Sequence, residues 1–183
     1  MVLGVVACSL VFAKAGQAQR SRAELPHVVT AMGLDLALPV LEGLRFELAP
    51  AARDAFQAYD FRWRNTRGAF ELRVELLPER GDTTLAPHVR AGARVLHNAR
   101  NDEGDFVGRF RGGTDDLERL GAEWAYFWDY APKSELGAWR RCYQASYYRA
   151  GRGLVTMWLL YDDPDYLHSD WVYVLPFVEA RAQ

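Results

Sequence analysis

Cysteine is scarce in this chain, which contains only Cys8 and Cys142 among its 183 residues. Cys8 lies in an apolar N-terminal stretch that we expect to be removed on export, so Cys142 is left without an intrachain disulfide partner. Cys142 lies near Trp139 and Tyr143 in a predicted strand, where an unpaired cysteine ordinarily packs as a small hydrophobic residue. The scarcity therefore excludes a disulfide framework for the mature chain, and a reactive thiol at Cys142 is the alternative interpretation.

Strong net charge and long apolar runs are also missing. The formal net charge is -2 and the basic residues are scattered, so we expect no nucleic-acid partner. The apolar run from Val2 to Phe12 has about eleven residues, which is too short to span a bilayer as a helix. The composition is otherwise that of a globular protein, 50% hydrophobic and 25% charged, and the length suits one domain.

The common catalytic motifs do not occur. The sequence has no G-x-S-x-G, no phosphate-binding P-loop, no H-E-x-x-H and no C-x-x-C, so we assign no catalytic residue and predict no cofactor. A Cys–His hydrolase requires a histidine beside Cys142, and sequence cannot establish that approach. The four histidines are His27, His88, His97 and His168.

Residues 1–18, MVLGVVACSLVFAKAGQA, have the features of a signal peptide. An uncharged apolar core is followed by small residues, and we expect cleavage after Ala18, although no Lys or Arg precedes the core. VVAC, ending at Cys8, resembles a lipobox; lipidation of Cys8 requires a start codon further upstream and gives the only predicted membrane attachment. A buried N-terminal strand or helix is the alternative. We expect export to the periplasm or cell envelope, with residues 19–33 as a polar tether.

The middle of the chain alternates apolar and polar residues with the period of a strand. YDFRWRN (59–65) and AFELRVELLPE (69–79) are separated by a short turn with glycine, which predicts an antiparallel hairpin. Residues 139–149 and 154–161 predict a second hairpin, and residues 34–48 predict two short strands.

Helical spacing appears in residues 85–100, where Val89, Ala93 and Leu96 recur on one side. A basic stripe of Arg90, Arg94 and His97 lies opposite, and we interpret it as a solvated face, with anion binding as the alternative. Short helices are also predicted at 114–121 and from residue 163 to about residue 171. The prediction is therefore one α+β domain over 34–179, an antiparallel sheet built from hairpins with helices packed on it.

The order of these elements, with LALPVLEGLRFEL, FELRVELLP and the two hairpins, resembles the PsbP/Mog1-like fold, particularly its small secreted bacterial members. The resemblance implies an antiparallel sheet flanked by helices that works as a binding or assembly domain. The functional residues of the known branches do not map onto this sequence, and none is carried over.

AEWAYFWDYAPK (122–133) is the densest aromatic stretch. As a strand it places Trp124, Tyr126, Trp128 and Tyr130 on one face, where they anchor a core or form the wall of a partly open groove. We favour the core. If a ligand groove exists, Trp124, Tyr126 and Trp128 would bind the ligand, with Arg140 or Arg62 fixing its polar end.

YDDPDYLH (161–168) suggests a metal site with Asp162, Asp163, Asp165 and His168 as ligands. The favoured interpretation is structural, because Asp before Pro caps a helix and Asp165 suits the positive end of its dipole.

We therefore expect an exported, non-enzymatic envelope protein that binds a protein partner or a small ligand. The alternative is an envelope hydrolase or a metal-dependent enzyme with a site that no motif marks.

Overall fold

The computed structural model describes residues 27–36, 46–50, 59–65, 70–79, 86–100, 107–166 and 169–178. The predicted signal peptide, including Cys8, lies outside these ranges, as does the metal candidate His168. Among the described residues, no helix has the length and hydropathy needed to cross a bilayer.

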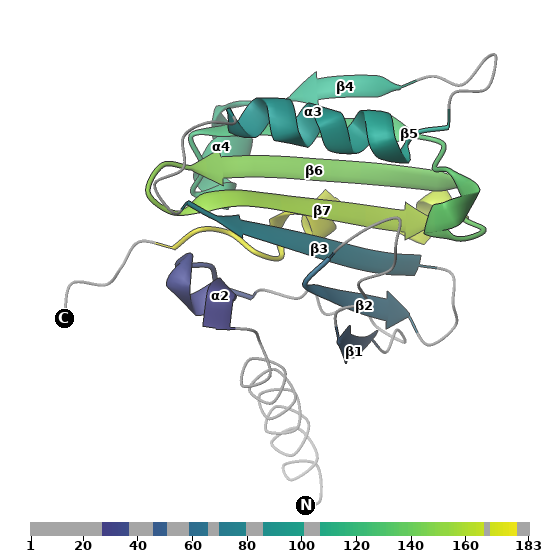
Figure 1. The fold of residues 1–183 in the computed structure, drawn as a ribbon, viewed down its shortest axis with the longest axis horizontal. Helices are drawn as coiled ribbons and strands as arrows, with labels where there is room; N and C mark the ends of the chain where they lie inside the picture. The colour runs from purple at the N-terminus through teal and green to yellow at the C-terminus, as the bar shows by residue number, and fades with distance from the viewer. Residues whose placement is uncertain are drawn as a thin grey trace, which may run out of the picture.

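The centre of the molecule is a seven-stranded antiparallel sheet with the order β1-β2-β3-β7-β6-β5-β4 (Figure 1). Its strands are β1 (Phe46–Pro50), β2 (Phe61–Asn65), β3 (Phe70–Pro78), β4 (Gly108–Arg111), β5 (Trp124–Tyr130), β6 (Arg141–Arg149) and β7 (Gly153–Tyr161). The helices are α2 (His27–Ala31), α3 (Pro87–Asn98) and α4 (Thr114–Leu120), and the 3-10 turns are η1 (Ser134–Leu136), η2 (Pro164–Tyr166) and η3 (Ser169–Tyr173). The α+β class and both predicted hairpins, β2–β3 and β6–β7, are confirmed.

Two segments differ from the prediction. The stretch predicted as a tether contains α2, and its Val29 and Met32 are buried in the core, so the packed part of the chain begins earlier than residue 34. The helix predicted from residue 163 is replaced by η2 and η3. Asp163 Oδ1 accepts a 3.0 Å hydrogen bond from the Asp165 amide, so the first turn is capped as predicted although it does not extend into an α-helix.

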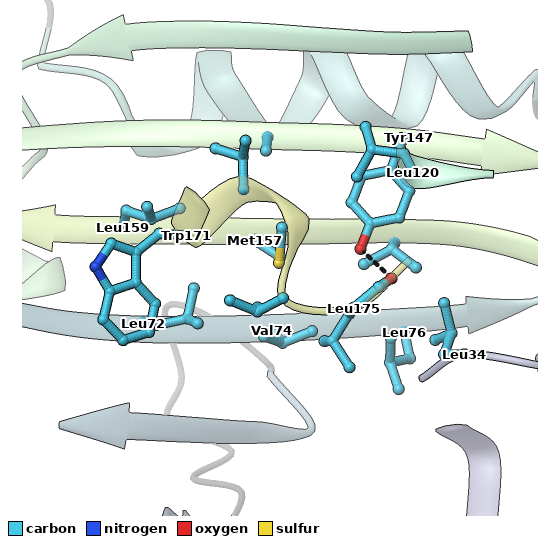
Figure 2. Packing of buried hydrophobic residues seen from close by; sticks show 14 of the residues in the cluster. Leu34, Leu72, Val74, Leu76, Leu120, Tyr147, Met157, Leu159, Trp171 and Leu175 are labelled. Atoms are coloured by element: carbon cyan, nitrogen blue, oxygen red, sulfur yellow. Dashed lines mark hydrogen bonds between the residues drawn. The ribbon is translucent and has the colours of Figure 1, made fainter. Parts of the chain in front are cut away.

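One face of the sheet carries the larger apolar core (Figure 2). Alternate residues of β3, β7 and β6 pack beneath α2, α4 and the C-terminal segment, because side chains two apart on a strand share a face. Tyr147 on β6 donates a 2.7 Å hydrogen bond to the Leu175 carbonyl, and this bond satisfies the only polar atom of a fully buried ring. Trp171 on η3 packs against Phe70 on β3, with ring centroids 4.8 Å apart.

The opposite face is covered in its middle by α3, which lies across β6 and β7 (Figure 1). The predicted orientation of this helix is wrong: Val89 and Leu96 are 52% and 76% exposed, while Ala91 and Val95 are buried. A hydrogen bond between the helix and the sheet explains this orientation. Gln144 on β6 donates a 3.1 Å hydrogen bond to the Ala91 carbonyl, so the side of the helix that carries Ala91 faces the sheet.

Candidate functional site

A cleft of about 350 Å³ lies between the polar face of β2 and β3 and the loop that joins β5 to β6. We call it the arginine cleft. It is lined by Arg62, Arg64, Glu71, Arg73, Leu136, Gly137, Ala138, Trp139 and Asp162.

The alternation of side chains along β2 determines which face of the sheet carries its two arginines. Phe61 and Trp63 on β2 point into the larger core and are nearly fully buried, so Arg62 and Arg64 project from the opposite face. In the β2–β3 register, Arg62 lies opposite Arg73 and Arg64 lies opposite Glu71. The hairpin therefore gathers three guanidinium groups around one carboxylate.

Glu71 is the centre of this cluster, with a side chain only 4% exposed. Its Oε1 accepts a 2.6 Å charge-assisted hydrogen bond from Arg73 Nε, and Arg73 Nη2 also donates to the Leu136 carbonyl at 2.8 Å. Arg73 thus holds Glu71 and the η1 loop together. Its role is to support the cleft rather than to meet a ligand.

Arg62 and Arg64 are held more loosely. Each guanidinium approaches Glu71 Oε2 only to 3.9 Å, which is an ion-pair distance but too long for a hydrogen bond. Arg62 Nε is buried, and no atom of the described residues accepts a hydrogen bond from it. A buried donor without an acceptor costs about 1–3 kcal/mol. The side chain of Arg62 is 32% exposed, so its terminal N–H groups are the ones that can meet an acceptor in the cleft.

The opposite wall comes from the loop between β5 and β6. Trp139 is partly exposed and lines the cleft, and it also borders a second groove of about 560 Å³ that contains Arg100 and Lys133. Asp162 closes the end of the cleft, where its Oδ1 accepts a 3.0 Å hydrogen bond from the Arg140 amide. Three guanidinium groups face two carboxylates, so the local charge is positive although the whole chain is slightly acidic.

The structure divides the predicted ligand residues into two groups. Arg62 lines the cleft, and the backbone amide of Arg140 donates a hydrogen bond to Asp162, which also lines it. The three aromatic residues lie on β5 instead: Trp124, Tyr126 and Trp128. Three strands separate β2 from β5, which is roughly 19 Å at the usual strand spacing. A small ligand bound at Arg62 therefore does not reach the β5 aromatics.

The β5 aromatics are both core and surface. Trp128 is nearly buried and packs with α3, whereas Trp124 and Tyr126 are partly exposed beyond the helix. Trp124 stacks on Tyr148 with centroids 5.9 Å apart, and the Arg109 guanidinium lies 4.4 Å from the Tyr126 ring centroid. The predicted core interpretation therefore describes the Trp128 end of the strand, and a partly open aromatic surface occupies the other end.

Two other expectations concern reactive groups. Cys142 is fully buried, and burial raises the pKa of its thiol to about 12, so it is not a thiolate at neutral pH. Asp162, Asp163 and Asp165 are exposed, and within the described ranges no three acidic, histidine or cysteine side chains are grouped to hold a metal ion. His168 lies outside those ranges.

Sequence reasoning selected Arg62 but not its partners in the cleft. The polar face of the β2–β3 hairpin also carries Arg64, Glu71 and Arg73. The alternation of the two strands predicts that these charged residues lie on one face, and that pattern could have identified them. Trp139 carries no such signal, because its loop reaches the cleft only through the β6–β7–β3 order of the sheet.

Searches against protein-family models, curated proteins and solved structures found no match to this chain.

Proposed function

We propose that this protein is a non-enzymatic binding protein of the cell envelope, and that the arginine cleft binds the carboxylate or phosphate group of a small ligand. The observation that supports this most strongly is the state of Arg62 and Arg64, whose guanidinium groups line the cleft without a close hydrogen-bonded carboxylate. Arginine donors suit planar anions because two N–H groups can address two oxygens at once.

The neighbours of the arginines indicate a ligand with an apolar body. Trp139 offers an indole surface on the wall of the cleft, and Leu136 lies on the same loop. A ring attached to the anionic group would pack there while the anion meets Arg62 and Arg64. Phenyl phosphate and benzoate have this chemistry, and inorganic phosphate has only its anionic part.

Isothermal titration calorimetry with these three compounds tests the proposal. Saturable binding is expected, with phenyl phosphate or benzoate binding more tightly than phosphate. Arg62→Ala and Arg64→Ala should each weaken binding about tenfold, the loss of one charge-assisted hydrogen bond. Arg109→Ala is the matched control, because Arg109 is an exposed arginine on β4, across the sheet from the cleft, and should not change affinity. Equal affinities in all four proteins, or no saturable binding of any probe, would contradict the proposal.

Export is the second part of the proposal, and it rests on the apolar core and small residues of positions 1–18. Expression of the full chain in a bacterium, fractionation and mass measurement of the purified protein test it. A mature N-terminus at Gln19 supports simple cleavage, and a lipid-modified N-terminal Cys8 supports the lipoprotein alternative. An uncleaved chain in the cytoplasm contradicts both.

The PsbP/Mog1-like fold belongs to this proposal as well. Its support is the element order, in which the β2–β3 hairpin, α3, β5 and the β6–β7 hairpin follow one another as the resemblance implies. An experimental structure superposed on members of that fold tests it, and a different strand order would refute it.

A further inference from the structure

The outer edge of the sheet at β4 carries features that the arginine cleft does not explain. β4 is the last strand of the sheet, pairs with β5 alone, and lies along the upper border in Figure 1. Edge strands present unpaired backbone N–H and C=O groups, which natural sheets usually protect from association.

Its side chains differ on the two faces of the sheet. Arg109 lies opposite Trp128 and Arg111 opposite Tyr126, so both arginines project from the face that α3 partly covers. Phe110 projects from the other face and is 56% exposed. Val107, directly before the strand, is 40% exposed, so two of the large exposed apolar side chains of the described residues lie at this edge.

The arginines of the edge are available for an incoming charge. Neither Arg109 nor Arg111 forms an ion pair with a carboxylate of the described residues, and the nearest acid on β5, Asp129, is bound by Arg141 at 3.1 Å. The Arg109 guanidinium is positioned by its contact with the Tyr126 ring. This cation–π contact orients the group without neutralising it.

Pairing with a second copy of this chain is disfavoured. An antiparallel pair of β4 strands that keeps the faces of the two sheets aligned places arginine opposite arginine, and like charges directly opposite destabilise a strand pair. The same charges attract a segment of opposite sign.

We propose that the β4 edge binds an extended acidic segment of a partner protein by strand addition. Acidic side chains at alternate positions face Arg109 and Arg111, and the apolar side chains between them cover Phe110. The backbone hydrogen bonds of the added strand give affinity, and the alternation gives specificity.

The test uses a fluorescein-labelled peptide in which glutamate and valine alternate, with binding to the full chain followed by fluorescence anisotropy. We expect saturable binding at least tenfold tighter than that of a lysine–valine peptide. A peptide of the same composition with glutamates and valines in separate blocks should bind more weakly, because it cannot present one kind of side chain to each face.

Variants separate this site from the arginine cleft. Arg109→Glu combined with Arg111→Glu should weaken binding of the alternating peptide by more than tenfold, while Arg62→Ala should leave it unchanged. Hydrogen exchange of the β4 amides should slow when the peptide is bound. Equal binding of the block peptide, no loss in the double variant, or unchanged exchange would overturn strand addition. A dimer in sedimentation that the double variant abolishes would overturn it too, because a second copy would then occupy the edge.

Discussion

Gln144 Oε1 accepts a 2.9 Å hydrogen bond from the indole Nε1 of Trp158 on the neighbouring strand, and both side chains are fully buried. The same oxygen accepts a 3.0 Å bond from the Tyr130 hydroxyl, while Gln144 Nε2 donates to the Ala91 carbonyl. One amide thus satisfies two aromatic donors and attaches α3 to the sheet, which makes it the centre of a buried polar network.

Gln144→Leu should lower the free energy of unfolding by about 2–4 kcal/mol, because it leaves the Trp158 and Tyr130 donors buried without an acceptor. Thr156→Val is the matched control, since it preserves shape and removes only the 3.3 Å bond from Ser146 Oγ, and should cost less than about 1 kcal/mol. Urea denaturation measures both. Equal losses would show that the network contributes no more than a single weak bond.

Glu75 predicts a pH dependence of stability. Burial raises the pKa of Glu75 above its ordinary value of 4.5, and the ion pair with Arg94 only partly opposes this. As pH rises above 4.5, Glu75 loses its proton in the unfolded state before it does so in the folded state. The Glu75 carboxyl therefore lowers the free energy of unfolding until it also ionises in the folded state. The free energy of unfolding of the wild type minus that of Glu75→Gln should therefore fall as pH rises above 4.5. Denaturation at a series of pH values measures this difference, and a rise would mean that Arg94 dominates.

The aromatic strand β5 should respond differently at its two ends. Trp128→Ala should cost about 3–5 kcal/mol of stability, because the ring is nearly buried beneath α3. Trp124→Ala removes a ring of the same size that is partly exposed, and should cost less than half as much. Thermal or urea unfolding of the two variants decides between core and surface roles, and equal costs would refute the division.

Much of the fold follows from the sequence because its signals are local. The β2–β3 hairpin is predicted from alternation alone, since Phe61 and Trp63 alternate with arginines and a short turn follows. The orientation of α3 is not predictable in this way, because Val89 and Leu96 compete with Ala91 and Val95 for the buried side. Distant partners decide it, namely Gln144 on β6 through its bond to the helix and Glu75 on β3 through Arg94.

The position of the candidate site depends on the order of the strands in the sheet, which the sequence does not reveal locally. The sequence suggests Arg140 or Arg62 as the polar partner of the β5 aromatics, and in the sheet β3, β7 and β6 lie between Arg62 and β5. Strand order results from the pairing of β3 with β7, two segments far apart in the sequence, and no periodicity within either strand reports it.

Glu71→Gln tests the electrostatics of the arginine cleft in the direction opposite to the arginine variants. Glu71 now competes with any anion for Arg62 and Arg64. Its neutralisation should tighten binding of phenyl phosphate about tenfold, since the guanidinium groups then lack an internal counterion. It should also lower stability, because the guanidinium of Arg73, itself nearly buried, loses its charged partner. Weaker binding in calorimetry, with the variant folded by circular dichroism, would contradict this account.

The most direct measurement follows the side-chain Nε–H signal of Arg62 by nuclear magnetic resonance while phenyl phosphate is added, with the signal assigned through Arg62→Lys. An anion bound by the terminal nitrogen atoms of Arg62 changes the charge distribution of the whole guanidinium group, so the Nε–H signal should shift and saturate while the signal of Arg109 stays in place. An Arg62 signal that does not move, or that moves no more than that of Arg109, would show that the cleft does not bind anions.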